Sequence, residues 1–284
     1  SWGNDGGPRE NPDTGFRSHP RALQSPAGRV RSETFADHYS QARQFYISQT
    51  RAEQTHIADA FVFELSKVQR EDIRARVVGH LLNVDKTLAE KVATGLGLTP
   101  MPEPAEAARQ PRTDLPVSDK LSIIRNGPDS FKGRRLGVLV SDGVDTKLID
   151  ALKQALDDEG AELKVVAPTI HGVTTSDGSV LAADEQIDGG PSVLCDAVAL
   201  LMTDNEADTL ASHGPARDFV NDAFAHCKFI GYNKAAKALL KSAGLEEKVD
   251  AGCLTLDTTE QAATLVKQCQ TGRYWQRQEH VDIV

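Results

Sequence analysis

A histidine and a cysteine stand side by side at positions 226 and 227, and they are the first candidates for chemistry. A cysteine thiolate attacks acyl carbons when a neighbouring histidine takes its proton, which requires that the two side chains meet. Residues 229–232 form an apolar run, so we place the pair at the start of this strand. Because adjacent strand residues point to opposite faces, the sequence predicts no dyad from His226 and Cys227.

The turn after that run is the second candidate, because it has the place of a nucleophile elbow. In hydrolases of alternating strands and helices, a strained turn of this kind exposes a serine or cysteine. Asn233 takes the elbow position here, with Tyr232 before it, and neither is an activated nucleophile. His171 and His213 stand in predicted loops without an evident partner. We therefore assign no catalytic residue.

Metal-ligand side chains gather in one predicted helix, at Glu53, His56, Asp59 and Glu64. Glu53 and His56 are three residues apart and share a helix face. A metal held in this way needs ligands from other helices, and no second Glu-x-x-His occurs in the sequence. Thr50 and Glu53 form a capping box, which explains Glu53 without a metal. We assign no metal-binding residue.

The loop over residues 141–145 follows the first predicted strand, where many nucleotide-binding proteins hold a phosphate. It reads SDGVD, and its single glycine lies between two aspartates, which repel phosphate. Neither a G-x-G-x-x-G nor a Walker sequence occurs in the chain. Asp145 is explained as a helix cap, so we assign no cofactor-binding residue.

Two kinds of periodicity divide the chain. Apolar residues recur at helical spacing over residues 35–98, which predicts a small helical bundle. From residue 132 onward, strands alternate with helices, which predicts an α/β fold with a doubly wound parallel sheet in a flavodoxin-like order. The predicted strands are 136–140, 163–167, 197–202, 229–232 and 253–256, with a hairpin at 175–180 and helices from about 145, at about 215–226, 234–243 and 259–270.

Composition places the boundaries between these parts. Residues 1–32 are rich in glycine, proline and arginine and are expected to form an extended wrapping arm. Residues 33–98 form the helical domain, and residues 99–131 a linker whose first part, 99–116, holds five of the thirteen prolines. Residues 132–284 form the C-terminal domain.

Charge and cysteine content exclude several classes of protein. The 284 residues carry 32 basic and 41 acidic side chains, a net charge of −9, which argues against binding to nucleic acid or to an anionic membrane. No apolar run is long enough to span a bilayer. Four cysteines without metal spacing and the lack of a signal segment predict buried thiols in the cytoplasm.

The helical part resembles a known family in residues 31–46, 61–68 and 83–85. These runs are similar to the helical domain that follows the barrel of large-subunit haem catalases. The part beyond residue 132 resembles the extra flavodoxin-like domain of those catalases, itself similar to class I glutamine amidotransferases. The resemblance covers the chain and is looser beyond residue 117. It implies that Ser1 lies inside such an enzyme, just after its barrel.

The resemblance implies an oxidoreductase of oxidative-stress defence, a homotetramer that decomposes hydrogen peroxide to water and oxygen at a haem. The iron of that family is held by a tyrosine in an R-x-x-x-Y helix. None of Tyr39, Tyr46, Tyr232 and Tyr274 has arginine four residues before it. The chain is therefore expected to be the structural C-terminal region and not catalytic alone. The resemblance also implies no NADPH, because in large-subunit catalases the C-terminal domain covers the surface where small-subunit catalases bind it. The haem belongs to the full-length parent, and the partners are the barrel domain and the other subunits.

Two other functions remain open at this point. A stand-alone holdase-type chaperone would use apolar surface that the missing barrel leaves exposed. A degenerate amidotransferase-like hydrolase would keep the fold of those enzymes without the cysteine at the elbow.

Overall fold

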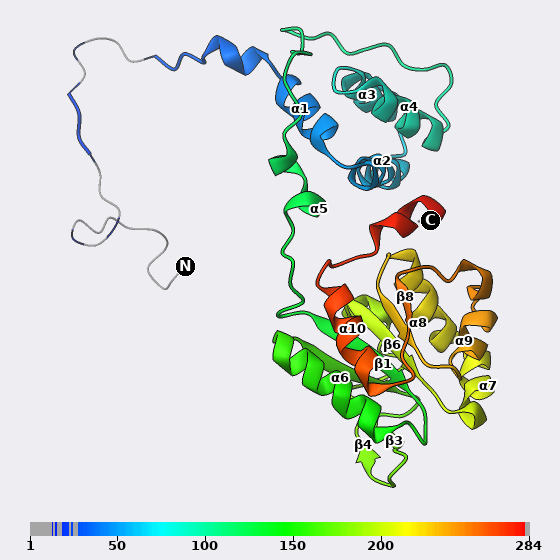
Figure 1. Cartoon of the computed structure of the whole chain (residues 1–284). Helices are drawn as coiled ribbons and strands as arrows, with labels where there is room; N and C mark the ends of the chain where they lie inside the picture. Colours follow the sequence, from blue (N-terminus) through cyan, green and yellow to red (C-terminus); the bar gives the residue numbers. More distant parts are fainter. Residues whose placement is uncertain (1–12, 14, 16–18, 23, 25–27, 282–284) are drawn as a thin grey trace, which may run out of the picture.

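The computed structural model describes residues 13, 15, 19–22, 24 and 28–281, so most of the predicted arm lies outside the described residues. Four helices follow a short 3-10 turn, η1 (Glu33–Ala36), and fold against each other. They are α1 (Ser40–Ser48), α2 (Arg51–Ser66), α3 (Glu71–Leu82) and α4 (Lys86–Gly95). Figure 1 shows them as one layer, apart from the sheet. No described helix is long and apolar enough to cross a membrane.

The predicted caps explain where these helices begin. The backbone nitrogen of Thr50 donates to the Glu53 carboxylate over 2.7 Å, and the Glu53 nitrogen donates to the Thr50 hydroxyl over 3.3 Å. Asp85 accepts from the nitrogens of Thr87 and Leu88 at the start of α4. These bonds satisfy amides that have no partner inside a helix. The capping box and the Asp85 cap are therefore confirmed.

The proline-rich segment does not run free as a spacer, because it is bonded to the helical layer along its length. Backbone nitrogens of Ala105, Arg112 and Ser118 donate to the Gly79 carbonyl and to the hydroxyls of Ser40 and Ser48, over 2.8 to 2.9 Å. Two short turns that the periodicity did not predict follow, η2 (Asp119–Leu121) and α5 (Ile123–Asn126). The chain then enters the sheet domain.

The sheet is parallel in every described pairing. Its order is β5-β2-β1-β6-β7-β8, in which the five longer strands follow the doubly wound order 2-1-3-4-5. The strands are β1 (Arg135–Val140), β2 (Glu162–Ala167), β5 (Glu185–Gln186), β6 (Ala197–Leu201), β7 (Ile230–Tyr232) and β8 (Cys253–Thr255). An antiparallel hairpin, β3 (Val173–Thr174) with β4 (Val180–Leu181), stands outside this sheet. The predicted α/β fold is confirmed.

Helices cover both faces of the sheet (Figure 1). The helices α6 (Thr146–Glu159) and α10 (Thr259–Cys269) pack on one face. On the other lie α7 (Asp204–Ser212), α8 (Gly214–Ala225) and α9 (Lys237–Ser242). The side chains of β6 are buried from end to end, as expected for a strand covered on both sides.

The structure differs from the sequence prediction at His226 and Cys227. These residues form a turn after α8, and β7 begins only at Ile230. Cys227 is left-handed, with φ 55°, and the nitrogens of Cys227 and Lys228 donate to the carbonyls of Phe224 and Ala223. This Schellman pattern ends the helix and reverses the chain. The assignment of His226 and Cys227 to a strand was wrong. It was made because the apolar run that follows them looks continuous with them in the sequence.

The last described residues return from the sheet to the helical layer. They form η5 (Trp275–His280), which lies beside α2 (Figure 1). The amide oxygen of Gln278 and the His56 Nε2 atom are 2.8 Å apart, and the Glu279 carboxylate lies 3.1 Å from Arg51. The two parts of the chain are thus in contact at a second place besides the linker.

Candidate functional site

The carboxyl ends of the strands are the usual ligand site of a doubly wound sheet, at the point where the strand order reverses. Here that point lies between β1 and β6, and side chains from the two loops bond to each other. The Ser141 hydroxyl accepts from the Thr203 nitrogen over 3.0 Å, and the Thr203 hydroxyl donates to the Asp142 carbonyl over 2.9 Å. The polar groups of the crevice are used within the fold.

The β3–β4 hairpin covers the same edge. The Asp142 carboxylate accepts from the Thr174 nitrogen over 2.7 Å, and the Gly143 nitrogen donates to the Thr174 carbonyl over 2.6 Å. The Asp177 carboxylate fixes the hairpin turn by accepting from the Ser179 backbone nitrogen and from the Thr175 hydroxyl. These bonds also lower the pKa of the Asp177 carboxyl. The hairpin and the two loops therefore close the crevice among the described residues.

Asn233 holds the end of β7 to the end of β6. Its amide nitrogen donates to the Met202 carbonyl over 2.7 Å, and its amide oxygen accepts from the nitrogens of Met202 and Ala236. The residue at the elbow thus completes the backbone bonding of two strand ends. Its chemistry is that of a structural amide.

We expect Asn233→Ala to lower the free energy of unfolding by about 1–3 kcal/mol, because the partly buried Met202 groups lose their partner. Urea denaturation measures this loss. Asn205→Ala, at an exposed position of α7, is the control and should change stability by less than about 0.5 kcal/mol. Equal losses in the two variants would contradict the structural role of Asn233.

The histidines and cysteines do not form a catalytic pair among the described residues. The exposed His226 bonds through Nδ1 to the Asp222 carbonyl at 2.8 Å, while the Cys227 sulfur is buried, 3.6 Å from the Gln278 amide oxygen. Burial raises the pKa of the Cys227 thiol, which disfavours the nucleophilic thiolate. All four cysteines are buried and unpaired, as predicted. His213 differs from the prediction, because its Nε2 atom lies 3.5 Å from Asp188.

Glu53 and His56, two of the metal-ligand side chains of α2, bond to other partners. The Glu53 carboxylate accepts from the Thr50 and Ile124 nitrogens and from the Ser122 hydroxyl. Burial alone would raise its pKa, but these bonds outweigh burial and lower it. His56 bonds to Gln278 and packs against Trp275, with ring centroids 5.9 Å apart. Glu53 thus joins the linker to the helical layer, and His56 contacts the returning segment.

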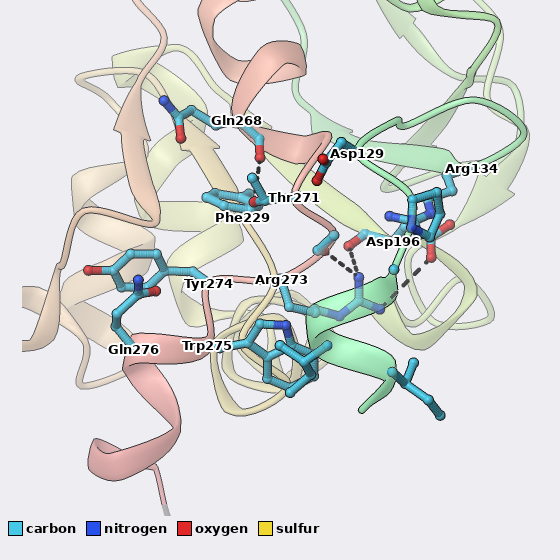
Figure 2. A pocket seen from close by; sticks show the side chains of 15 residues that line it. Asp129, Arg134, Asp196, Phe229, Gln268, Thr271, Arg273, Tyr274, Trp275 and Gln276 are labelled. Atoms are coloured by element: carbon cyan, nitrogen blue, oxygen red, sulfur yellow. Dashed lines mark hydrogen bonds and ion pairs between the residues drawn. The ribbon is translucent and has the colours of Figure 1, made fainter. Parts of the chain in front are cut away.

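A cavity of about 730 Å³ lies at the opposite, amino-terminal edge of the sheet. Arg134, Asp196 and Phe229 each stand just before a strand and line it (Figure 2). Its remaining walls come from α5, from residues 127–129 after it, and from residues 268–276. Sequence reasoning missed this place, because its walls come from segments far apart in the chain. The run of Arg273, Tyr274 and Trp275 was the available signal.

Sequence reasoning also missed a buried ion pair that fastens the returning segment. Arg277 donates through Nε and Nη2 to the two Asp250 oxygens over 2.7 and 2.8 Å. Its Nη1 atom donates to the Lys228 carbonyl over 2.7 Å, and its guanidinium lies 4.2 Å from the Phe224 ring centroid. The Arg277 side chain is fully buried, and 25% of the Asp250 side chain is exposed.

Comparisons with known proteins agree over the two parts of the chain. Residues 32–96 match the family model described as catalase-related immune-responsive, and residues 132–279 match that of the C-terminal domain found in long catalases. Catalase C of Rhizobium meliloti is 52% identical over 283 residues, which are 100% of this chain and 40% of that protein. Catalase HPII of Pseudomonas putida is 36% identical, over 99% of this chain and 39% of that protein. The chain thus spans about 40% of the length of these relatives.

Proposed function

The chain belongs to the family of long catalases, and on this premise we propose that it is the structural C-terminal region of a haem catalase. The full-length enzyme would convert hydrogen peroxide to water and oxygen, while this region would not be catalytic alone. The observation that carries the proposal is the closed crevice between β1 and β6, where Ser141, Thr203 and the β3–β4 hairpin bond to one another. A doubly wound domain closed at that edge fits a structural role.

The residues of this chain do not fit a haem. Haem iron in a catalase is bound by a tyrosine oxygen. The Tyr39 hydroxyl bonds to the His80 Nδ1 atom at 2.8 Å, and Tyr46 and Tyr232 are buried within the two cores. Tyr274 packs edge-on against Phe229. The proposal therefore places the haem in the rest of the parent enzyme.

The partners in this proposal are the catalase barrel and the other subunits of a homotetramer. Exposed phenylalanines on the helical layer support such contacts: the exposed fractions of Phe35, Phe45 and Phe63 are 64%, 46% and 63%. Burying these rings against another protein would be favourable. The four unpaired thiols support a reducing compartment, the cytoplasm. Exposed phenylalanines would serve a docking surface and a chaperone equally, so no observation on the described residues favours the chaperone or the hydrolase over the catalase role.

We expect the purified chain, mixed with equimolar hemin, to evolve oxygen from hydrogen peroxide no faster than hemin alone. The physical reason is that none of its four tyrosines is placed to bind the iron in a catalase geometry. An oxygen electrode measures the rate, and an absorbance spectrum reports the iron ligand. Rapid oxygen evolution together with the spectrum of a tyrosine-bound haem would overturn the proposal. An authentic full-length catalase, assayed in parallel, is the positive control.

A further inference from the structure

The cavity at the amino-terminal edge of the sheet has no part in the proposed structural role. It is lined by α5 and the linker residues after it on one side and by the returning segment on another, and Figure 2 shows its labelled side chains. Its volume of about 730 Å³ falls within the range of small-molecule sites, about 300 to 1,000 Å³. The lining combines aromatic rings with two guanidinium groups, from Arg134 and Arg273.

Arg273 is held in place from within the fold. Its Nη1 atom donates to the Asp196 carbonyl over 2.8 Å and to the Gly272 carbonyl over 2.9 Å. Its Nη2 atom lies 3.9 Å from an Asp196 oxygen, and the other Asp196 oxygen accepts from the Arg135 nitrogen. The Asp196 carboxylate is thus shared between Arg273 and the Arg135 backbone, and its single negative charge balances the charge of Arg273 alone.

Arg134 supplies the second positive charge. Gly272 permits its close approach, because a Cβ atom there would lie 3.1 Å from Arg134 Nη1. Burial lowers the pKa of Arg273, and the nearby charge of Arg134 lowers it further, against the opposing effect of Asp196. Among the described residues Arg134 has no ion-pair partner. A bound anion would accept from both guanidiniums and relieve their repulsion.

The aromatic side of the cavity offers flat surfaces for a ring. Phe229 is buried behind Tyr274, with ring centroids 6.2 Å apart, so both rings are fixed. The Trp275 ring packs against His56, with ring centroids 5.9 Å apart. Planar ligand rings stack on aromatic side chains of this kind, whatever substituents the ligand ring carries.

We propose that this cavity binds a small organic anion with a planar ring, its negative group on Arg134 and Arg273 and its ring against Trp275 or Tyr274. Nucleoside monophosphates and aromatic carboxylates share this chemistry. Asp129 lies exposed on the rim, where solvent screens its opposing charge. The site is independent of the catalase proposal, because it uses neither the closed crevice nor the exposed phenylalanines.

Titration calorimetry on the full chain tests the proposal with four probes: AMP, benzoate, adenosine and inorganic phosphate. We expect AMP or benzoate to bind. Adenosine and inorganic phosphate are the two parts of AMP, and each should bind at least about tenfold more weakly than AMP. Binding by AMP alone identifies a phosphate ligand, and binding by benzoate alone a carboxylate. Equal binding of adenosine and AMP would overturn the role of the guanidiniums.

Three variants assign the binding to this cavity. Arg134→Gln should weaken it at least about tenfold, because a charge-assisted bidentate contact is lost. Arg135→Gln, next in sequence but exposed and paired with Glu162, is the matched control and should bind as the parent chain does. Asp129→Asn should change binding by less than about twofold, because solvent already screens that exposed carboxylate. If neither AMP nor benzoate binds, or if Arg134→Gln binds as well as Arg135→Gln, the proposal fails.

Discussion

Replacing Arg277 with methionine is expected to lower the free energy of unfolding of the sheet domain by about 3–5 kcal/mol. The substitution leaves the Asp250 carboxylate, only 25% exposed, without its two charge-assisted bonds. The carbonyl of Lys228 also loses its donor. Methionine fills a similar volume, so the loss measures the ion pair rather than a cavity. Urea denaturation followed by circular dichroism gives the value.

The pH dependence distinguishes this ion pair from simple packing. Burial opposes ionisation of Asp250, but the bonds and charge of Arg277 outweigh burial and lower its pKa. A carboxyl with a lowered folded pKa stabilises the fold above its unfolded pKa of about 3.9, and this contribution is lost as the pH falls through the folded value. The difference between the parent and Arg277→Met should therefore shrink below about pH 4.

The exposed pair of Arg135 and Glu162 provides the control. Their side chains are 53% and 57% exposed, so solvent screens the interaction. Arg135→Met should cost less than about 1 kcal/mol. A loss of that size for Arg277→Met as well, unchanged between pH 3 and 7, would contradict the role given to the buried pair.

The second large effect is expected from Phe219→Ala, with a loss of about 3–5 kcal/mol. Phe219 on α8 is 1% exposed and packs in the core between α8 and the sheet. Gly137 of β1 lies against it, since a Cβ atom there would be 3.5 Å from the ring and 2.5 Å from the Cys195 sulfur. Backbone and ring are in close contact, so the cavity left by alanine cannot collapse. Thermal and urea unfolding both report the loss.

Phe63→Ala is the matched control for that experiment. Phe63 lies on α2, is 63% exposed and contacts the Lys67 ammonium, 3.9 Å from its ring centroid. We expect a loss of less than about 1 kcal/mol, since most of the ring is already in water. If Phe63→Ala destabilises the chain as strongly as Phe219→Ala, the helical layer is more tightly packed than its exposure indicates.

Local signals allowed much of the fold to be predicted. Asp145 accepts from the Lys147 nitrogen at the start of α6, and Gly160, with φ 74°, ends that helix, as their residue types indicate. The helix α7 was missed because three acidic residues and small side chains give it little apolar periodicity. At Cys227 the left-handed turn lacks the glycine that usually marks such a position.

The candidate sites depend on contacts that no local pattern encodes. The sequence alone shows that the elbow position, Asn233, carries no nucleophile. It does not show the bond from Asp142 to the hairpin, because that bond joins loops 32 residues apart. The cavity at Arg134 and Arg273 requires the linker and the returning segment to meet. Spacing predicts which residues share an element, but not which distant segments an element will contact.

The last described residues return to α2, so the helical layer and the sheet domain are connected twice. The linker joins them covalently, and the contact of Gln278 with His56 joins them noncovalently. Removal of η5 would remove the contacts of Gln278 and Glu279 with α2 and leave the linker as the connection between the two parts. The returning segment is therefore a poor place for a fused tag, because a tag there would crowd these contacts.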